Sequence, residues 1–378
     1  MTTLLQRSRE TWRDIGGLHT AEEIAQQPVV WRELHASLGT ERERVDAFLD
    51  GCLANPLQQV VLTGAGSSAY VGEIVADELN AMWPAQVRAI PTTTLLTHPE
   101  LYLEPGAPLL LVSFARSGDS PESLAAANLV RDLVPGARLL NITCNPDGML
   151  ALKSSADPLA RNLLMPPSSC DRGFAMTSSF SCMLLAALAV LGKADDLDRI
   201  AALAHLADRA LRDWEPALAA LAEVPAERVV YLGSGPLEGL AKESALKLLE
   251  LTGGRVPAMA NTPLGFRHGP KSVLNHASLV IVYGSGKALA RRYGEDLVDE
   301  LRRDGVAGRV LTVGTGADIG IEAPDWPDAW LAPLWLLVAQ QYALHRSAAM
   351  QLRPDNPFAS GTVNRVVKGV TIYRHDEH

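Results

Sequence analysis

The hydrophobic positions of the chain fall into short apolar runs that alternate with longer stretches of helical periodicity. The short runs are rich in Val, Leu and Ile and end in Gly, Ser or Pro, as buried strands do. They cover 59–63, 87–91, 108–113, 139–143, 162–165, 228–232, 256–259, 279–283 and 309–314. Helical patterns lie between them, notably at 71–82, 177–191, 197–221, 291–304 and 326–349. Because strands and helices alternate along the chain, we expect an α/β fold with parallel sheets.

Residues 1–50 lack such strands and predict a helical segment, with Thr20 as the N-cap of one helix. After this segment, the order strand, Gly/Ser turn and helix recurs in two halves, which is a weak internal repeat. The length of 378 residues is that of two or three ordinary domains. We therefore expect two α/β domains, at 51–200 and 201–378, after the helical segment.

Two Ser-rich turns follow strands of the first half. Residues 64–70 read GAGSSAY after the strand 59–63, and residues 116–120 read RSGDS after the strand 108–113. Free backbone N–H groups and hydroxyls at a helix N-terminus bind phosphate, although a bare tight turn has the same composition. Neither a GxGxxG nor a GK[ST] motif is present. Turns that follow neighbouring parallel strands open into one crevice, so the pair favours phosphate binding more than either turn alone.

A charged stripe marks the helical pattern that opens the segment 239–270. Glu243, Lys247 and Glu250 have a spacing that places them on one helix face, while apolar residues cover the other faces. The stripe is either a solvated face with a surface ion pair or an active-site stripe on a buried helix. The apolar surroundings and the nearby sequence Arg267-His268-Gly269-Pro270, which places a titratable histidine in a tight turn, favour the second interpretation.

Composition narrows the classes of partner. The formal net charge of −9 argues against nucleic acid, because proteins that bind the phosphate backbone are usually basic. Four widely spaced cysteines form no CxxC pair, so we expect reduced thiols, no zinc site and a cytoplasmic location. The apolar run at 182–191 is too short to cross a membrane, and no set of metal ligands or cofactor motif is visible. We expect no membrane partner, metal or cofactor.

Five motifs together resemble the sugar isomerase (SIS) family. They are GAGSSAY at 64–70, RSGDS at 116–120, GSGPLEGLAKESALKLLE at 233–250, RHGP at 267–270 and the tail PDNPFASGTVNRVVKGVTIY at 354–373. The chain is similar to the isomerase half of glucosamine-6-phosphate synthase. Its N-terminal TAEEIAQQPVVW and its SFARSGDSPES context resemble more closely the bacterial galactosamine-6-phosphate deaminase/isomerase subfamily, also called tagatose-6-phosphate ketose/aldose isomerases.

The resemblance implies two SIS domains, each a doubly wound parallel sheet, and a sugar-phosphate ligand. It also implies a homodimer, or a higher homo-oligomer, that shares active sites between subunits. The residues that match phosphate-binding positions of the family are Ser67, Ser68, Arg116, Ser117 and Ser120.

The same resemblance implies catalytic roles for five residues. Glu250 matches the carboxylate that moves a proton between C1 and C2, and His268 matches the histidine that opens the sugar ring. Glu243 and Lys247 match the companions of this carboxylate, and Lys368 matches a lysine that closes over the sugar. A Schiff base to Lys368 is not required, and we expect a metal-independent enediol mechanism.

Some positions depart from the family pattern. Ala115 stands where a serine often begins the second phosphate loop, and a glutamate that commonly precedes the histidine is replaced near Gly265. Cys is absent from position 2 and no glutaminase sequence precedes the isomerase motifs, so we expect deamination, or a reaction that moves no nitrogen, rather than synthesis.

The leading hypothesis is an amino-sugar-6-phosphate deaminase/isomerase that converts galactosamine 6-phosphate to tagatose 6-phosphate and ammonia. The alternatives are glucosamine-6-phosphate deamination and aldose–ketose isomerisation without deamination. A non-catalytic phosphosugar-sensing SIS module is the alternative from another class. Residues 1–50 are acidic, whereas such sensors usually carry a basic DNA-binding segment, so the enzyme is favoured.

Overall fold

The structure is a computed structural model that describes residues 3–193, 196–373 and 375. It divides into two compact units, and each is built from segments that are distant in sequence. The first-sheet unit comprises 30–170, 178–200 and 361–378, and the second-sheet unit comprises 1–29, 171–177 and 201–360. The predicted domain boundaries at 50 and 200 stay a prediction, because the two units are not continuous in sequence. Residues 171–177 belong to the second-sheet unit, and residues 361–378 belong to the first-sheet unit.

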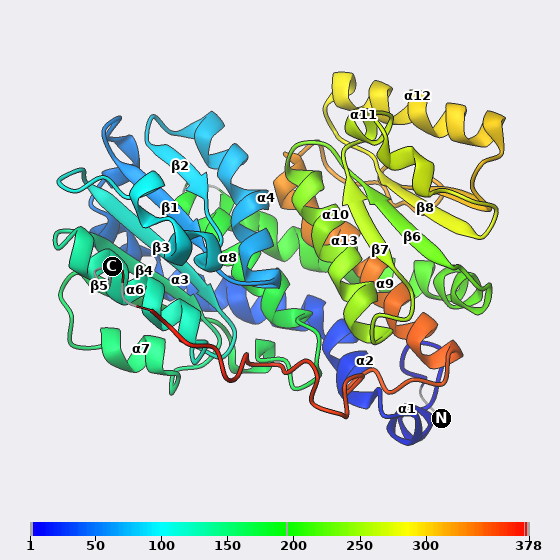
Figure 1. The fold of residues 1–378 in the computed structure, drawn as a ribbon, viewed down its shortest axis with the longest axis horizontal. Coiled ribbons are helices and arrows are strands. Elements are labelled where there is room, and N and C mark those ends of the chain that lie inside the picture. The colour runs from blue at the N-terminus through cyan, green and yellow to red at the C-terminus, as the bar shows by residue number, and fades with distance from the viewer. Residues whose placement is uncertain (1–2, 194–195, 374, 376–378) are drawn as a thin grey trace. The chain divides into compact units, whose positions relative to one another are not determined.

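The first-sheet unit contains five parallel strands in the order β2-β1-β3-β4-β5 (Figure 1). The strands are β1 (Gln59–Thr63), β2 (Gln86–Ala89), β3 (Leu109–Ala115), β4 (Arg138–Thr143) and β5 (Ala160–Leu164). The helices between and after them are α4 (Ser67–Met82), α5 (Thr92–Thr97), α6 (Pro121–Leu133), α7 (Met149–Ser154) and α8 (Ser178–Leu191). Short 3-10 turns lie at Cys52–Ala54, Pro99–Leu101 and Pro167–Ser169. β3 is buried along its whole length, as expected for the central strand of a parallel sheet.

Helices cover both faces of this sheet. α4 and α8 pack on each other and on the sheet, whereas α5, α6 and α7 form a second packed group. The core of that second group joins Val61 and Leu111 of the sheet to Ala126 and Val130 of α6. The chain moves from β1 to β2 on one side and then to β3 on the other, so the connections reverse between β1 and β3. A doubly wound α/β sheet binds its ligand at such a reversal.

The second-sheet unit repeats this plan with four parallel strands in the order β7-β6-β8-β9 (Figure 1). The strands are β6 (Arg228–Leu232), β7 (Ala258–Asn261), β8 (Ser278–Tyr283) and β9 (Arg309–Val313). Its helices are α10 (Pro236–Leu251), α11 (Pro263–Phe266), α12 (Ala288–Asp304) and α13 (Asp328–Ala349), and a 3-10 turn lies at Pro270–Val273. α10 packs on α13, β6 and β7, while α12 packs on β8 and β9. Here the connections reverse between β6 and β8.

The turn after the first strand has the same backbone conformation in both sheets. Gly66 (φ 58°, ψ −130°) precedes α4, and Gly235 (φ 57°, ψ −130°) precedes α10. This region of φ is readily open only to glycine. The internal repeat that the sequence predicts weakly is therefore clear in the backbone of these two turns.

Helices α1 (Arg9–Ile15), α2 (Leu18–Ala25) and α3 (Gln27–Leu49) form the predicted N-terminal helical segment, and α9 (Asp198–Glu223) follows α8. The N-cap prediction for Thr20 is wrong, because Thr20 lies inside α2 and Gly17 occupies the cap position. The Thr20 hydroxyl instead donates a hydrogen bond of 2.7 Å to Asp355. Within the described ranges, no helix is long and apolar enough to cross a membrane.

A buried carboxylate joins α2 to the segment 171–177 of the second-sheet unit. Glu23 is 2% exposed and accepts hydrogen bonds from the backbone N–H groups of Arg172 at 2.6 Å and Gly173 at 3.1 Å. Burial, with the nearby charge of Asp171, raises the pKa of Glu23 to about 8 despite these hydrogen bonds. Glu23 therefore holds a proton in the folded chain at neutral pH.

We expect Glu23→Gln to change how stability depends on pH. The folded carboxyl keeps its proton up to about pH 8, whereas the unfolded chain loses it near 4.5. The folded state thus binds more protons between these values, so the free energy of unfolding of the wild type falls as pH rises, by at most about 1.4 kcal/mol per pH unit. The variant lacks this contribution. Urea unfolding of both proteins at pH 5, 7 and 9 measures it, and parallel pH profiles would contradict a buried, protonated Glu23.

Candidate active site

The first predicted phosphate loop lies at the start of α4. Ser67 and Ser68 occupy the first turn of this helix, directly after Gly66, and each is 5% exposed. The helix begins four residues earlier than the pattern at 71–82 predicts, so both serines are helical residues. Their N–H groups belong to a helix N-terminus, which carries a partial positive charge, and the Ser68 N–H donates a hydrogen bond of 3.2 Å to the carbonyl of Ala65. This turn has the form of an anion site without a basic side chain.

The second predicted loop connects β3 to α6. Because β1 and β3 are paired, with Thr63 opposite Ser113, the two loops leave neighbouring strands at the same edge of the sheet. The Ser117 hydroxyl accepts a hydrogen bond from the Asp119 N–H at 3.2 Å, and the Ser120 hydroxyl donates to Glu122 at 2.6 Å. The prediction that the two turns follow neighbouring parallel strands is therefore confirmed, and their opening into one crevice stays a prediction.

Asn145 holds this second loop in place, a role that was not predicted from the sequence. Its side-chain amide donates a hydrogen bond of 2.8 Å to the carbonyl of Ser117. Asn145 follows β4 at the carboxyl edge of the sheet, and that position was the signal that could have identified it.

Helix α10 carries the predicted charged stripe, and the stripe is buried. Glu243 and Lys247 are fully buried, whereas the side chain of Glu250 is 22% exposed. The Lys247 ammonium lies 3.2 Å from a carboxylate oxygen of Glu243 and donates a hydrogen bond of 2.6 Å to Glu250. Of the two interpretations of the stripe, the solvated surface face is wrong. α10 is buried because it packs against α13 and the strands β6 and β7.

The electrostatic environment of Lys247 keeps it charged. Burial acts to lower its pKa, but attraction to Glu243 and Glu250 and the hydrogen bonds to them outweigh burial, so its pKa is raised. A buried ammonium between two carboxylates fixes the orientation of both. Glu250, the partly exposed member, is the one that can reach a bound molecule.

His268 lies in the turn between α11 and the 3-10 turn Pro270–Val273. Its side chain is exposed, and in the part of the chain that the structure describes no hydrogen bond joins it to the carboxylates of α10. Gly265, near which the family resemblance implies a glutamate, lies three residues before His268. A Cβ on Gly265 would lie 2.7 Å from Asn261 Oδ1 and 2.8 Å from Thr262 Oγ1, so the turn has no room for a side chain there.

Glu300 of α12 ties down both sides of the His268 turn, a role that the sequence did not indicate. Its carboxylate accepts a hydrogen bond of 2.9 Å from Arg267, and its other oxygen pairs with Lys271. The hydrogen bond from Lys271, together with Arg267, lowers the pKa of Glu300 against the effect of burial. Arg267 and Lys271 make further ion pairs with Asp296 and Asp304 of the same helix.

Lys368 lies in the C-terminal segment 361–373, which has neither helix nor strand, and its side chain is exposed. This segment belongs to the first-sheet unit. There it meets the second phosphate loop, because the guanidinium of Arg116, a residue only 8% exposed, donates a hydrogen bond of 3.2 Å to the carbonyl of Arg365. The segment that carries Lys368 is thus anchored to a predicted phosphate-binding residue.

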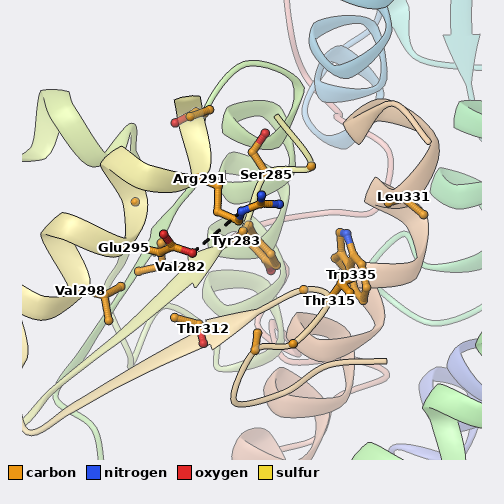
Figure 2. Close-up of a pocket in the computed structure, with 18 of the residues that line it drawn as sticks. Val282, Tyr283, Ser285, Arg291, Glu295, Val298, Thr312, Thr315, Leu331 and Trp335 are labelled. Atoms are coloured by element: carbon orange, nitrogen blue, oxygen red, sulfur yellow. Dashed lines mark ion pairs between the residues drawn. The ribbon is translucent and has the colours of Figure 1, made fainter. Parts of the chain in front are cut away.

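The structure brings the predicted residues together in two groups. The phosphate loops and the tail with Lys368 belong to the first-sheet unit, and the carboxylates of α10 and His268 belong to the second-sheet unit. A cavity of about 390 Å³ also lies in the second-sheet unit, at the carboxyl ends of β8 and β9, and none of the predicted site residues lines it (Figure 2).

Comparison with known proteins identifies relatives along nearly the whole chain, although no protein-family model matches the sequence. A protein of Streptomyces coelicolor that is named as a candidate D-galactosamine-6-phosphate deaminase AgaS is 49% identical, covering 95% of this chain and 96% of the relative. The D-galactosamine-6-phosphate deaminase AgaS of a Shewanella species is 40% identical, covering 97% of this chain and 94% of the relative.

Structural comparison agrees with these relatives. The crystal structure of a candidate tagatose-6-phosphate ketose/aldose isomerase from Clostridium novyi has a TM-score of 0.94 at 39% identity, and the match covers 99% of this chain and 100% of that one. A glutamine–fructose-6-phosphate aminotransferase from Bradyrhizobium diazoefficiens is a more distant relative at 25% identity, and the match covers 58% of its length. The predicted resemblance and the predicted fold class of two helix-flanked parallel sheets are confirmed. The chain belongs to the D-galactosamine-6-phosphate deaminase AgaS family and has the sugar isomerase fold.

Proposed function

We propose that this chain is an amino-sugar-6-phosphate deaminase/isomerase that converts galactosamine 6-phosphate and water to tagatose 6-phosphate and ammonia. The observation that carries the proposal is the buried Lys247 ammonium between Glu243 and Glu250, which leaves Glu250 oriented and partly exposed. A stable fold does not require such a group, because a buried ion pair contributes little net stability. A catalyst that moves a proton between two carbon atoms does require an oriented carboxylate.

The phosphate is anchored by Ser67, Ser68, Ser117 and Ser120, with Arg116 beside them. The N-terminus of α4 supplies backbone N–H donors, and the adjacent β3–α6 loop supplies hydroxyls. Anchoring the phosphate holds C1 and C2 of the sugar still relative to the catalytic groups, which is where much of the rate enhancement arises.

The reaction follows from the chemistry of these groups. His268 acts as acid and base in ring opening: it takes the proton of the O1 hydroxyl and gives a proton to the ring oxygen, so that the pyranose opens to the aldehyde. Glu250 takes the proton from C2 and returns it to C1, which converts the open aldehyde to an enolamine and then to an imine at C2. Water adds to this imine, and the carbon–nitrogen bond breaks to release ammonia and leave the ketone. The mechanism that we propose needs no metal or cofactor.

Two lysines support these steps. Lys247 is a positioning residue that holds Glu250, because its ammonium is already bonded to Glu250 and close to Glu243. Lys368, on an exposed segment anchored at Arg116, stabilises negative charge at O1 when the sugar is bound. A Schiff base to Lys368 is not needed for this role.

We further propose a cytoplasmic homodimer in which His268 acts on the sugar of the neighbouring subunit. The support is the exposure of His268 on a turn that Glu300 holds rigidly, an arrangement suited to presenting a side chain outward. In the described part of the chain no disulfide joins the four cysteines, which fits a reducing compartment.

We expect Glu300→Gln to lower the turnover number about 10- to 100-fold with little loss of stability. Loss of the charge releases Arg267 and Lys271, and the small displacement of His268 that results is costly for catalysis. Partly exposed ion pairs contribute only about 0.2–1 kcal/mol each, so the fold survives. Steady-state kinetics and urea unfolding measure the two effects. The matched control is Glu295→Gln on the same helix, because Glu295 makes only a long ion pair of 3.9 Å, with Arg291, among the residues that the structure describes. Equal turnover in both variants would remove Glu300 from the mechanism.

A substrate panel tests the proposed function against its alternatives. Purified protein is assayed with galactosamine 6-phosphate, glucosamine 6-phosphate and galactose 6-phosphate, and kcat/KM is compared for release of ammonia and formation of ketose. We expect the galacto amino sugar to be preferred. Preference for the gluco amino sugar would keep the mechanism and change the substrate. Conversion of galactose 6-phosphate alone would leave a plain isomerase, and binding without turnover would favour a phosphosugar sensor.

A further inference from the structure

The second sheet has its own cavity at the point where its connections reverse. The cavity of about 390 Å³ is lined by Ser234 from the turn after β6, by Gly284–Gly286 after β8 and by Gly314–Ala317 after β9. α12 forms one wall, from which Arg291 and Glu295 extend (Figure 2). Ligands of doubly wound sheets bind at this place, outside the carboxyl ends of the strands. The proposed chemistry of the chain uses none of these residues.

The two turns that flank this reversal are built like the phosphate loops of the first sheet. The turn after β6 shares its backbone conformation with the turn after β1, as Gly235 and Gly66 show. In the turn after β8, the Ser285 hydroxyl accepts a hydrogen bond of 3.0 Å from the N–H two residues later, just as Ser117 does after β3. The second sheet therefore has the framework of a binding site.

A carboxylate of the chain itself occupies the anion position of this framework. Asp328, at the start of α13, is 7% exposed, accepts a hydrogen bond from the Ser285 hydroxyl and lies 2.7 Å from the N–H of Gly286. The donors that would hold a phosphate at this turn are thus already bonded to a fixed negative charge. A second anion beside it would be repelled and would find its donors taken.

The charges around the cavity also disfavour a phosphate. Arg302 pairs at 2.6 Å with Asp318, and Arg291 lies 3.9 Å from Glu295. Asp299 and Asp325 also line the cavity, and among the described residues neither has a recorded ion pair. The balance of unpaired charge in the lining is negative, which favours a neutral or cationic ligand.

The size and the apolar part of the lining narrow the ligand further. Trp335 contributes its aromatic ring to the wall, where Figure 2 shows it opposite the polar side chains of α12, and Trp326 also lines the cavity. Aromatic rings pack against the C–H face of a sugar, while carboxylates and arginines bond its hydroxyls. A volume of about 390 Å³ lies at the lower end of the roughly 300–1,000 Å³ of small-molecule sites, so a monosaccharide fits better than a larger ligand.

We propose that this cavity is a second binding site of the chain, for an unphosphorylated amino sugar. The ammonium group of the ligand pairs with Asp299 and Asp325, its hydroxyls bond Arg291 and the adjacent turns, and its apolar face lies on Trp335. The first sheet, with the N-terminus of α4 and Arg116 beside its turns, is left to bind the phosphorylated sugar, as the proposed function requires. The two sheets thus divide phosphorylated and unphosphorylated forms of one ligand class.

A cavity-filling variant tests the site directly. Gly294 lines the cavity from α12, and a Cβ there would meet only Val282, at 3.9 Å. Gly294→Leu should therefore fill the cavity without strain in the helix. Gly39→Leu is the matched control, because Gly39 is an exposed residue inside α3 with no atom within 4 Å of an added Cβ. Galactosamine is titrated calorimetrically into the wild type and both variants.

We expect galactosamine to bind the wild type and Gly39→Leu equally and to lose its binding in Gly294→Leu. Galactosamine 6-phosphate should give the same isotherm and the same turnover in all three proteins, because it uses the other site. Galactosamine binding that survives in Gly294→Leu would overturn the proposal, and so would its absence from the wild type. Neither result would touch the proposed function, which is read from turnover.

A second variant, on the protein surface, tests the same cavity in case Gly294→Leu does not fold. Asp299→Asn removes one exposed carboxylate of the lining, and we expect the affinity for galactosamine to fall about tenfold while that for neutral galactose stays the same. An equal change for both sugars, or no change for either, would contradict the assigned role of the acidic side chains.

Discussion

Replacing Glu250 with Gln should lower the turnover number for galactosamine 6-phosphate about 10²- to 10⁴-fold while KM changes little. Glutamine keeps the size of the side chain and can still accept the hydrogen bond that Lys247 donates to Glu250 at 2.6 Å. It cannot take a proton from carbon, and general acid–base catalysis contributes a factor of this order. Steady-state kinetics with a coupled ammonia assay measures the effect.

The control for this prediction lies on the same helix. Glu238, in the first turn of α10, is partly exposed and pairs with Lys242 at 3.4 Å. Glu238→Gln should leave turnover unchanged. A Glu250→Gln enzyme that retains more than about a tenth of wild-type turnover would show that another group moves the proton.

Replacing Lys247 with Met should lower the free energy of unfolding by about 3–5 kcal/mol. Methionine fits the space of the lysine stem, but the fully buried Glu243 loses the cation that lies 3.2 Å from it. Removing one partner of a buried ion pair has a cost of this size, because the remaining charge is left uncompensated. Urea denaturation monitored by tryptophan fluorescence gives the value.

The double variant Glu243→Gln/Lys247→Met separates the loss of charge balance from the loss of packing. With both buried charges removed, most of the lost stability should return, whereas turnover should stay low because Glu250 is no longer held. A double variant as unstable as Lys247→Met would mean that packing of the lysine stem, and not the uncompensated charge, causes the effect.

The elements of the fold could be predicted from local patterns, because apolar runs that end in Gly, Ser or Pro mark buried strands of parallel sheets. All nine expected strands are present, although β7 begins at Ala258 and not at 256. The start of α4 was predicted too late, because Ser67 and Ser68 have the composition of a loop although they occupy a helical first turn. How the segments divide between two units could not be predicted, since the contacts of Glu23 with Arg172 and Gly173 span about 150 residues of sequence.

The candidate site was predictable where a spacing carries the information. The intervals between Glu243, Lys247 and Glu250 place the three side chains on one helix face, and the apolar residues around them indicated burial. The residues that support the site carry no such signal. Glu300 is one acidic residue among several on α12, and only the structure shows its contacts with Arg267 and Lys271. Asp328 accepts a hydrogen bond from the N–H of Gly286, which lies 42 residues away in sequence, so no local pattern reveals this contact.

The most direct test of the proposed reaction is to measure ammonia and ketose phosphate in one reaction mixture of purified protein and galactosamine 6-phosphate. We expect ammonia and tagatose 6-phosphate to appear at the same rate and in a one-to-one ratio, and both to be lost in Glu250→Gln. Formation of a ketose without ammonia, or binding of the amino sugar phosphate without any product, would contradict it.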